Sequence, residues 1–503
     1  MDNIIVISQN VKLESLHLLR NHIKPGSESV VLSTQYVFDN EAAIIRKQLG
    51  TVCLFLNFAD LMTDADGERC DKEAYKGNTC TLWQYYDEIK VLKNRMLVER
   101  ILEKYPCENK LLVCDDLGID ASTWTNNGFV RVDCEYYHNP VVAHVGLLTR
   151  IIRGVWNRLW PYKIKKFYNW DIHVAYKDGK KYLFFGSLNR IGYRLDLVFK
   201  KASKWENVKY IIQHYTYKLF RFFLDNKTTR LSTLHECFAW QFPCHENVNL
   251  KLIQDGYLPS NYCSRYLMYY GPKAEFYTWD SIGKLTFEYH GLKNRIIPFR
   301  KKLFLPSPNY PTKLKKVLCV ASGSGDWTAV KNRSDEDKMM VAFGKVAELF
   351  PAVEFIYRCH PVWVHPQHQG VNSIVRAAEY IDYLNLPNLK ISANIPNAAK
   401  EGGGYILSYK RSSFEEDLEG VDIVFGEHSI SMIDAAFKNI LFCSVNVTGR
   451  RDFFQSITDL GFPHCESVEE ISALLNAIIT PDFKQKYDSA VERYNNMTNE
   501  EEQ

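Results

Sequence analysis

The sequence predicts an α/β protein built from two Rossmann-like domains. Short apolar runs typical of buried strands alternate with longer amphipathic segments, and this alternation occurs on both sides of a proline-rich stretch. The chain has 503 residues, which is more than one hydrophobic core usually holds, so two or three domains are expected. Strands that alternate with helices favour parallel sheets covered by helices on both faces.

The first series of elements begins at the N-terminus. Its strand candidates are "NIIVIS" (3–8), "SVVLST" (29–34), "TVCLFLN" (51–57) and "KLLVCDD" (110–116), and "TLWQYYDEIKVLKNRMLVERILEKY" (81–105) has helical periodicity. The pattern breaks after residue 130 and returns with "VNLKLIQDGYLPS" (248–260). We therefore expect an N-terminal domain over 1–300 that carries a basic and aromatic insertion at about 130–240.

The insertion contains two local patterns. The segment 145–170 has six basic residues and no acid, interleaved with Leu, Ile and Trp. Such a segment is typical of a surface that contacts an anionic membrane or a lipid-linked partner, and the alternative is a solvated basic face packed on the domain. "IHVAYKDGKKYLFFGSL" (172–188) predicts a β-hairpin that turns at Asp178-Gly179.

The second series follows a linker, "FLPSPNYPTKLKK" (304–316), in which three prolines cluster. The predicted strands are "KVLCVAS" (316–322), "VEFIYRCHP" (353–361), "DIVFGEH" (422–428) and "ILFCSVN" (440–446). The predicted helices are "SDEDKMMVAFGKVAELF" (334–350), "SMIDAAFKN" (431–439) and "ISALLNAII" (471–479), and "KEGGGYIL" (400–407) is expected to be a loop. We expect a C-terminal domain over 313–485 and a polar tail over 486–503.

Composition excludes several classes of protein. With 46% hydrophobic and 24% charged residues the chain is an ordinary globular protein, and a net charge of +3 is too small to indicate nucleic-acid binding. The first residues lack the basic start and the cleavage site typical of a signal peptide, so we expect none. No apolar run of 18 residues exists in the sequence, so we expect no membrane span. The 13 cysteines are scattered through predicted strands, as buried free thiols are in a reducing compartment, so the chain is expected to be cytoplasmic.

One cluster has the residue types of a metal site. His235, Cys237, Cys244 and His245 lie close together in the sequence. Their spacing does not match the usual paired-ligand zinc patterns, so local packing is the preferred interpretation.

Polar residues gather where the predicted strands of the second domain end. His360 and Pro361 close one strand, and Arg358 lies two positions earlier. Proline stops a strand, so the histidine is presented at the edge of the sheet, although most single histidines in such places are structural. Ser429 and Ser431 lie at the predicted start of a helix.

These residues together predict an anion site. Ligands of parallel sheets bind outside the carboxyl ends of the strands, and N–H groups and hydroxyls at a helix start bind anions. His360 and Arg358 would complete a phosphate clamp. Simple N-capping remains the alternative for the two serines.

Acidic residues follow other predicted strands. The stretch "VASGSGDWTAV" (320–330) contains Ser324, Gly325 and Asp326 in a turn, and the alternative is an ordinary strand-to-helix turn capped by the aspartate. In the first domain, Asp255 ends a strand.

"CDDLGID" (114–120) places Asp115 and Asp116 in a similar position. A carboxylate in a partly desolvated cleft can act as a general acid or base, although each of these first-domain aspartates also suits a turn.

The order of these motifs resembles that of bacterial GT-B glycosyltransferases that use CMP-activated acidic sugars. These are the GT-B sialyltransferases and, more closely, the retaining β-Kdo transferases of capsule and lipopolysaccharide assembly. The Kdo transferases carry a Leu-Glu-Asp-Gly-Phe motif where this chain has "IQDGY" (253–257). The resemblance covers about 253–445. Gln254 replaces an acid of the motif, and 130–240 has no counterpart.

The resemblance extends to individual positions. The family has an aspartate after the first strand of the second domain, and Asp326 is at the corresponding position here. The family also has a basic residue two positions before a His-Pro, and these positions correspond to Arg358 and His360. Its Thr-Ser before an alanine-rich helix corresponds to His428-Ser429.

The resemblance implies a mechanism. Asp326 would be the nucleophile that forms a glycosyl-enzyme intermediate, and Asp255 would be the acid/base residue. His360, Arg358 and Ser429 would donate to the departing phosphate. It implies no metal and no other cofactor, because the leaving nucleotide is a monophosphate.

The function expected from the resemblance is transfer of Kdo or a related ulosonic acid from a CMP-sugar to a surface-polysaccharide or glycolipid acceptor. The partners would be the nucleotide sugar and an oligosaccharide or lipid-linked acceptor, with peripheral contact at the inner face of the membrane through 145–170. The alternatives are an inverting CMP-sialic acid transferase in which Asp326 is structural, a GT-B enzyme that uses UDP- or GDP-sugars, and a noncatalytic scaffold docked on a membrane.

Overall fold

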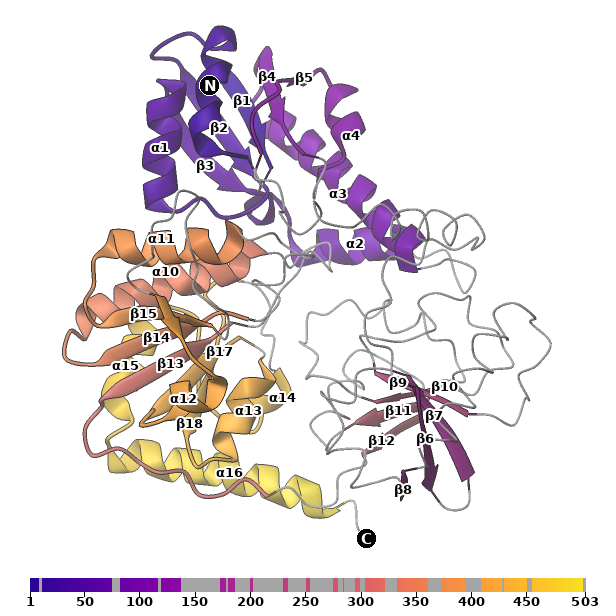
Figure 1. Cartoon of the computed structure of the whole chain (residues 1–503), viewed down its shortest axis with the longest axis vertical. Helices are drawn as coiled ribbons and strands as arrows, with labels where there is room; N and C mark the ends of the chain where they lie inside the picture. The colour runs from indigo at the N-terminus through magenta and orange to yellow at the C-terminus, as the bar shows by residue number, and fades with distance from the viewer. Residues whose placement is uncertain are drawn as a thin grey trace, which may run out of the picture.

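In the computed structural model the described residues form three β-sheets, and helices pack on the N-terminal and the C-terminal sheet (Figure 1). The residues that the structure describes are 1–8, 11–74, 82–115, 119–136, 172–177, 180–185, 200–201, 229–233, 250–253, 275–278, 284, 295–298, 304–321, 333–360, 372–393, 409–427, 429–449 and 455–500. No helix in this part of the chain is long and apolar enough to span a bilayer.

The N-terminal sheet is parallel and has five strands in the order β3-β2-β1-β4-β5. The strands are β1 (Asn3–Ile7), β2 (Glu28–Ser33), β3 (Val52–Asn57), β4 (Asn109–Val113) and β5 (Val130–Arg131). All five residues of β1 are buried, as expected of a central strand covered on both faces. Numbered along the chain, this is the 3-2-1-4-5 order of a doubly wound domain.

Two separate cores flank this sheet. The helices are η1 (Leu13–His22), α1 (Asp39–Leu49), η2 (Phe58–Leu61), α2 (Asp64–Ala74), α3 (Leu82–Lys104) and α4 (Ala121–Thr125). Side chains of η1 and α1 pack on one face of the sheet, where Ile5 and Val31 lie. Side chains of α2, α3 and α4 pack on the other face, where Ile4 and Val30 lie. The alternation of residues along each strand therefore supplies apolar side chains to both faces.

The C-terminal sheet repeats this topology. It is parallel, with strand order β16-β15-β14-β13-β17-β18-β19. Its strands are β13 (Lys316–Val320), β14 (Glu354–Arg358), β15 (Leu389–Ala393), β16 (Tyr409–Arg411), β17 (Ile423–Gly426), β18 (Leu441–Val445) and β19 (His464–Cys465). Apart from the extra edge strand β16, this is the common 3-2-1-4-5-6 order of dinucleotide-binding domains.

Helices connect these strands and share one core with them. They are α10 (Arg333–Leu349), α11 (Asn372–Leu384), α12 (Phe414–Leu418), α13 (Ile430–Ala436), α14 (Gln455–Thr458), α15 (Val468–Ala477) and α16 (Pro481–Glu500). The expected α/β class with two Rossmann-like domains is thus confirmed.

The strands between the two domains form a sheet of their own, with order β12-β11-β10-β9-β7-β6-β8. They are β6 (Ile172–Lys177), β7 (Lys180–Phe185), β8 (Lys200–Lys201), β9 (Thr229–Thr233), β10 (Leu250–Ile253), β11 (Glu275–Thr278) and β12 (Arg295–Pro298). The predicted hairpin is confirmed, because β6 and β7 pair antiparallel with Lys177 opposite Lys180. β10, expected to continue the N-terminal sheet, pairs with β9 and β11 in this middle sheet.

The proline-rich linker packs on the last helix. The backbone N–H of Leu305 donates to Oδ1 of Asn495 at 2.8 Å, and the Tyr310 hydroxyl donates to Oδ1 of Asp488 at 2.7 Å. Residues 486–500, which we expected in a polar tail, belong to α16, and its Tyr487 and Tyr494 are buried. Each of these tyrosines packs its aromatic ring in the core. The polar composition of the segment does not indicate this burial.

Gly426, at the end of β17, allows the close approach of α13 to the sheet. A Cβ atom at this position would lie 2.9 Å from Sδ of Met432 and 2.9 Å from Cγ2 of Val320. Val320 is β-branched and lies in β13, so its methyl group cannot move aside easily.

We predict that Gly426→Ala destabilises the protein by about 1–3 kcal/mol through overpacking. The matched control is Gly344→Ala inside α10, where the new Cβ lies 2.7 Å from Cδ1 of Leu384 and 4.0 Å from Cδ2 of Leu389. Both atoms are the far ends of flexible side chains that can shift, and the substitution gains about 1 kcal/mol of helix propensity. Differential scanning calorimetry of both variants measures the difference. An unchanged thermal midpoint for Gly426→Ala would show that the contact relaxes freely.

Candidate active site at the domain junction

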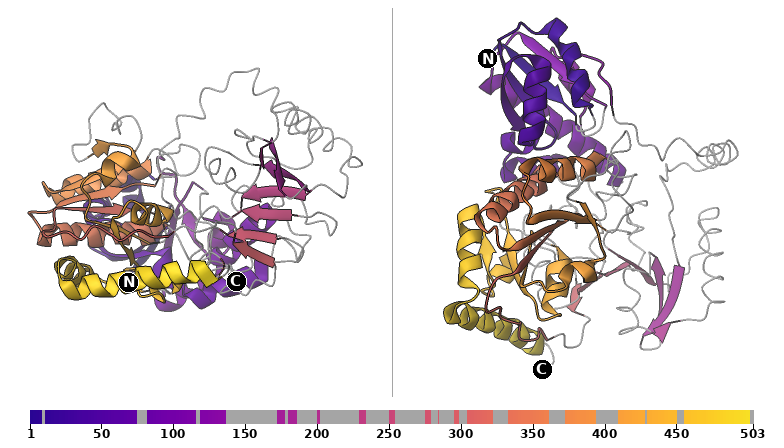
Figure 2. Two further views of the ribbon diagram at one scale, coloured as in Figure 1. Left: turned by 90° about the horizontal axis from the view of Figure 1, so that it is seen from below. Right: turned by 60° about the vertical axis from the view of Figure 1, so that its left-hand side comes forward.

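The carboxyl edges of the N-terminal and C-terminal sheets face each other. Residues just beyond β2 and β3 contact residues near the starts of α10 and α11, the helices that follow β13 and β14. The contacts are ion pairs of Glu41 with Arg376 and of Asp60 with Lys338, the latter at 2.7 Å. Figure 1 and the right-hand view of Figure 2 show α10 and α11 on the side of their domain that faces the N-terminal domain. Ligands of both sheets would therefore meet at this junction.

Arg376 on α11 is the more buried of the two cations that bridge this junction in the described residues, with 6% of its side chain exposed. It forms a two-point ion pair with Glu41, with Nη2 at 2.8 Å from Oε2, and Nη1 donates to Asp337 at 2.8 Å. It also donates to the backbone carbonyl of Tyr36. Burial lowers the pKa of Arg376, but the two carboxylates outweigh burial and raise it overall.

Aromatic rings support this cation. The guanidinium of Arg376 lies 4.3 Å from the ring centroid of Phe38, a cation–π arrangement. Phe38 in turn stacks on Tyr380 of α11, with centroids 4.3 Å apart. One buried arginine therefore links the two domains through charge, hydrogen bonds and stacking.

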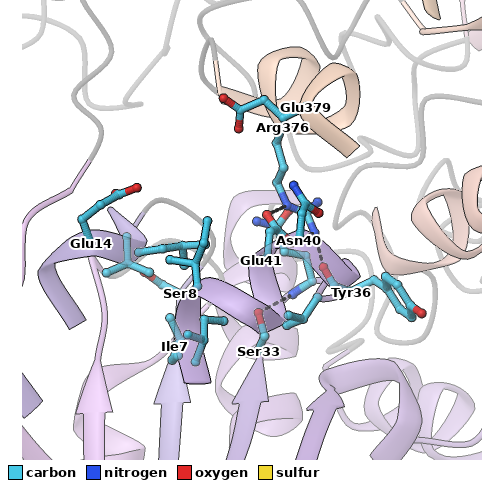
Figure 3. Close-up of a pocket in the computed structure, with 15 residues that line it drawn as sticks. Ile7, Ser8, Glu14, Ser33, Tyr36, Asn40, Glu41, Arg376 and Glu379 are labelled. Atoms are coloured by element: carbon cyan, nitrogen blue, oxygen red, sulfur yellow. Dashed lines mark hydrogen bonds and ion pairs between the residues drawn. The ribbon is translucent and has the colours of Figure 1, made fainter. Parts of the chain in front are cut away.

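A pocket of about 80 Å³ opens beside this arginine (Figure 3). Ser8 and Ser33 line it from the ends of β1 and β2, and Asn40 and Glu41 line it from α1, while Arg376 comes from α11. Both domains thus contribute to one polar cavity at the carboxyl edge of the N-terminal sheet.

The topological switch point of the C-terminal sheet lies between β13 and β17. Glu427 follows β17 directly and is 4% exposed, and Glu336 of α10 is fully buried. Burial first, and then the charges of Glu336, Cys359 and Glu427, raise the pKa of Cys319 well above its usual value. Two buried carboxylates therefore lie near the end of β13, where a doubly wound sheet binds its ligand.

Sequence reasoning missed Glu427. The available signal was its position, because it stands between the predicted strand 422–426 and the serine that starts the next helix.

Arg358, predicted to bind phosphate, has a structural partner. Its Nη1 lies 2.5 Å from Oδ2 of Asp417, a fully buried carboxylate, and 3.1 Å from the carbonyl oxygen of Ser412. The hydroxyls of Ser392 and Ser412 each donate to Asp417 at 2.6 Å. This network ties β14 and β15 to α12, and the phosphate-binding role of Arg358 stays a prediction.

The other predicted residues of this edge lie where strands and helices meet. His360 is half-buried two residues beyond β14. Ser429 is the N-cap of α13, and its hydroxyl accepts from the backbone N–H of Ser431 at 3.3 Å. The capping interpretation of Ser429 is confirmed, while anion binding at this position stays a prediction.

Several predicted residues lie outside the described part of the chain. They are Asp116, Asp255, Ser324, Gly325, Asp326, Pro361, His428, the four His and Cys residues at 235–245, the loop 400–407 and the basic segment 145–170. Asp115 is described, and its backbone N–H donates to the Ser8 hydroxyl at 3.3 Å. Asp255 follows β10, so its strand belongs to the middle sheet and not to the sheet that carries the pocket. Within the described residues no cluster of His, Cys, Asp or Glu is placed to hold a metal ion.

Comparison with known proteins identifies similar solved structures only. No protein-family model matches the chain, and no curated protein sequence matches it either. TarM is 9% identical over 100% of this chain and 98% of its own, with a TM-score of 0.36. A variant of S. aureus TarM in complex with fondaparinux, α-GlcNAc-glycerol and UDP is 11% identical over 99% of this chain and 100% of its own, with a TM-score of 0.34.

A glycosyltransferase from Rickettsia africae is 10% identical over 99% of this chain and 93% of its own, with a TM-score of 0.31. The fold class rests on the strand orders of the two parallel sheets.

We predict that Arg376→Met lowers the free energy of unfolding by about 3–5 kcal/mol, because it leaves Asp337 and Glu41 as buried carboxylates without their cation. The control is Lys338→Met, which breaks a more exposed ion pair across the same junction and should cost at most about 1 kcal/mol. Urea titration of the first unfolding transition compares the two. Equal losses would contradict the role given to Arg376.

The environment of Asp417 makes the stability of the protein depend on pH. Burial raises its pKa, but hydrogen bonds from Ser392 and Ser412 and the ion pair with Arg358 lower it overall. Because the pKa of Asp417 is lower in the folded than in the unfolded protein, its ionised form stabilises the fold. This contribution is complete above the unfolded-state pKa of about 3.9, and it is lost as the pH falls through the folded-state pKa.

We therefore expect Asp417→Asn to be less stable than the wild type at pH 7, with the difference shrinking as the pH falls below about 4. Thermal midpoints measured between pH 7 and pH 3 test this. Glu415→Gln, at an exposed position of the same helix, is the control and should parallel the wild type. A difference in thermal midpoint between Asp417→Asn and the wild type that does not change with pH would contradict the lowered pKa of Asp417.

Proposed function

We propose that this chain is a glycosyltransferase that takes a sugar from a nucleotide-activated donor. The observation that supports it best is the opposition of two doubly wound sheets at their carboxyl edges. Each such edge is a ligand site in open α/β sheets. Two opposed edges suit a reaction in which a group passes between two bound substrates.

The C-terminal domain is the better candidate for the donor. Its sheet has the full dinucleotide-binding strand order, and His360, Glu427 and Ser429 lie at its carboxyl edge. A buried carboxylate such as Glu427 accepts strong hydrogen bonds from sugar or ribose hydroxyls. A histidine at the same edge can donate to a departing phosphate.

The donor that the motif order predicts is a CMP-activated ulosonic acid such as Kdo. In the retaining mechanism, the Asp326 carboxylate attacks the anomeric carbon, the bond from this carbon to the phosphate oxygen breaks, and CMP leaves with the electron pair. The acceptor hydroxyl then attacks the same carbon, releases Asp326 and passes its proton to Asp255. A UDP- or GDP-sugar is the alternative donor at the same edge.

The acceptor would be an oligosaccharide or a lipid-linked sugar bound on the side of the N-terminal domain. The polar pocket at the carboxyl edge of its sheet supports this assignment. Contact of segment 145–170 with an anionic membrane remains part of the proposal, because its six basic residues suit such a surface.

Calorimetric titration with CMP, UMP, UDP and GDP tests the proposal. We expect the wild type to prefer CMP, and His360→Ala to bind it about tenfold or more weakly, because a hydrogen bond to a charged group contributes about 1.5–3 kcal/mol. Glu427→Gln should also weaken binding of the CMP-sugar. His17→Ala, an exposed histidine of η1, is the control and should bind as the wild type does.

The outcomes separate the alternatives. Preference for UDP or GDP would overturn the CMP assignment and keep the glycosyltransferase. No binding of any of the four nucleotides would overturn the proposed function and favour the scaffold. If CMP binds, mass spectrometry after mixing with CMP-Kdo should find an adduct on Asp326, and its absence in an active enzyme would contradict the retaining route.

A further inference from the structure

The edge strand β3 lacks the protection that the other edge strands have. Among the described strands, the three sheets end at β3, β5, β8, β12, β16 and β19. The other five have two to four residues, and all of them except β19 contain lysine or arginine. β3 has six residues, "VCLFLN", with no charge and no proline. Proteins usually shorten or charge an edge strand, because its outward N–H and C=O groups can pair with another strand.

Two apolar side chains of β3 are exposed on one face of the sheet. Val52 is 68% exposed and Leu54 is 39% exposed. Leu54 is the Cα partner of Val30, whose side chain lies in the core that α3 covers, so Leu54 and Val52 belong to that face. The helices of this face leave its outer strand uncovered. A strand added to β3 would bring apolar side chains of its own against these two.

Cations lie beside the opposite face of β3, at the end of α1. Arg46 and Lys47 are exposed in the last turn of this helix. The guanidinium of Arg46 lies 4.9 Å from the ring centroid of Phe55, whose side chain packs on the α1 face of the sheet. Arg20 is also exposed, and it donates two hydrogen bonds of 2.6 Å to backbone carbonyls at the end of α1.

Lys24 adds a fourth cation at the amino end of β3. It is exposed and starts the turn 24–27, which is hydrogen-bonded to the Gly50 carbonyl at 3.1 Å. Asp2 and Glu28 also lie at this end of the sheet, and Glu28 is 3.8 Å from the N-terminal ammonium. None of the four cations forms an ion pair with a carboxylate of the described residues. We call them the basic corner: Arg20, Lys24, Arg46 and Lys47.

We propose that the edge of β3 binds an extended acidic segment of a partner protein, which adds a strand to the N-terminal sheet. Side chains of a strand point alternately to its two faces. A segment that alternates apolar and acidic residues would place the apolar ones against Val52 and Leu54 and the carboxylates toward the basic corner. Alternate residues of β3, about three of six, direct their N–H and C=O groups outward to such a strand.

The charge of this edge favours an acidic segment over other partners. A second copy of β3 contains no acid, so it would leave the basic corner without counter-charges and bring a second set of cations. An anionic lipid surface would neutralise the cations, but it offers no strand to the long, uncharged edge. An acidic strand satisfies both features.

Fluorescence anisotropy with two labelled peptides tests the proposal. The peptides "GVEVEVEG" and "GVKVKVKG" have the same length and valines and differ in the sign of their charge. At pH 7 and low salt we expect the acidic peptide to bind about tenfold or more tightly than the basic one, and 1 M salt to narrow the difference. Equal binding of the two peptides, or no binding of the acidic one, would overturn the proposal.

N-methylated peptides test whether the segment binds as a strand. One carries methyl groups on the three valine nitrogens of "GVEVEVEG", and the other carries them on the three glutamate nitrogens. Alternate N–H groups of an added strand bond to its neighbour, so one of the two peptides should lose binding. If both bind as the parent peptide does, strand addition is overturned.

Charge-reversal variants assign the binding to the basic corner. Lys24→Glu combined with Lys47→Glu should weaken binding of the acidic peptide about tenfold. The control combines Lys313→Glu with Lys345→Glu, at exposed positions of the C-terminal domain, and should bind as the wild type does. Equal losses in the two double variants would show that only the overall charge matters, which would overturn the site.

A second pair of variants assigns the binding to the apolar side of the edge. Val52→Asn combined with Leu54→Asn should weaken binding about tenfold, because two apolar contacts are lost. Leu349→Asn combined with Ile479→Asn, at positions 61% and 50% exposed in the C-terminal domain, is the matched control. Thermal midpoints establish that every variant folds. Unchanged binding in the first pair would place the peptide elsewhere and overturn the site.

Other occupants of the edge give different results. A dimer in sedimentation velocity that dissociates in the Val52 and Leu54 variant, without peptide binding, would make β3 an interface between copies and overturn the proposal. Binding to phosphatidylglycerol vesicles that is lost in the Lys24 and Lys47 variant, without peptide binding, would overturn it in favour of a membrane.

The proposal goes beyond the glycosyltransferase function and does not rest on it. A protein that binds the acidic peptide but no nucleotide would support strand addition and overturn the proposed function. A protein that binds CMP but not the peptide would overturn strand addition and leave the proposed function standing.

Discussion

The buried ion-pair network of Arg376 fixes how the two doubly wound domains meet. A guanidinium removed from water is costly unless carboxylates surround it, and here Glu41 comes from one domain and Asp337 from the other. The network exists only when α1 approaches α10 and α11, so it selects one orientation of the domains among many. The opposition of the two carboxyl edges, and the pocket that residues of both domains line, both depend on this contact.

The chemistry of the site follows from its position at strand ends. Side chains within the strands are buried in the cores, as the fully buried β1 and β18 show. Polar groups become available only where a strand stops, and Ser8, Ser33, His360 and Glu427 all occupy such positions. A second buried network, of Arg358 with Asp417, ties the end of β14 to α12. Buried ion pairs and polar side chains at strand ends therefore lie at the carboxyl edges of both sheets.

Most strands of the two domains were predictable because a buried parallel strand is a short apolar run, and "NIIVIS" and "ILFCSVN" need no tertiary information to be identified. The local sequence does not determine which strands pair with each other. "VNLKLIQ" reads as another strand of the first domain, yet β10 pairs with β9 and β11 in a separate sheet. The amphipathic α16 was missed because its polar composition conceals the buried Tyr487 and Tyr494.

The sequence by itself determined the α/β class and the strand ends that carry polar residues, because periodicity and turn residues are local properties of the chain. Only the tertiary structure decided which polar residues meet. Arg358 is separated from Asp417 by 59 positions and Arg376 from Glu41 by 335, and no local pattern encodes such pairs. Burial removes each of these charges from water, so its partner is chosen by the packing of whole domains and not by neighbouring residues.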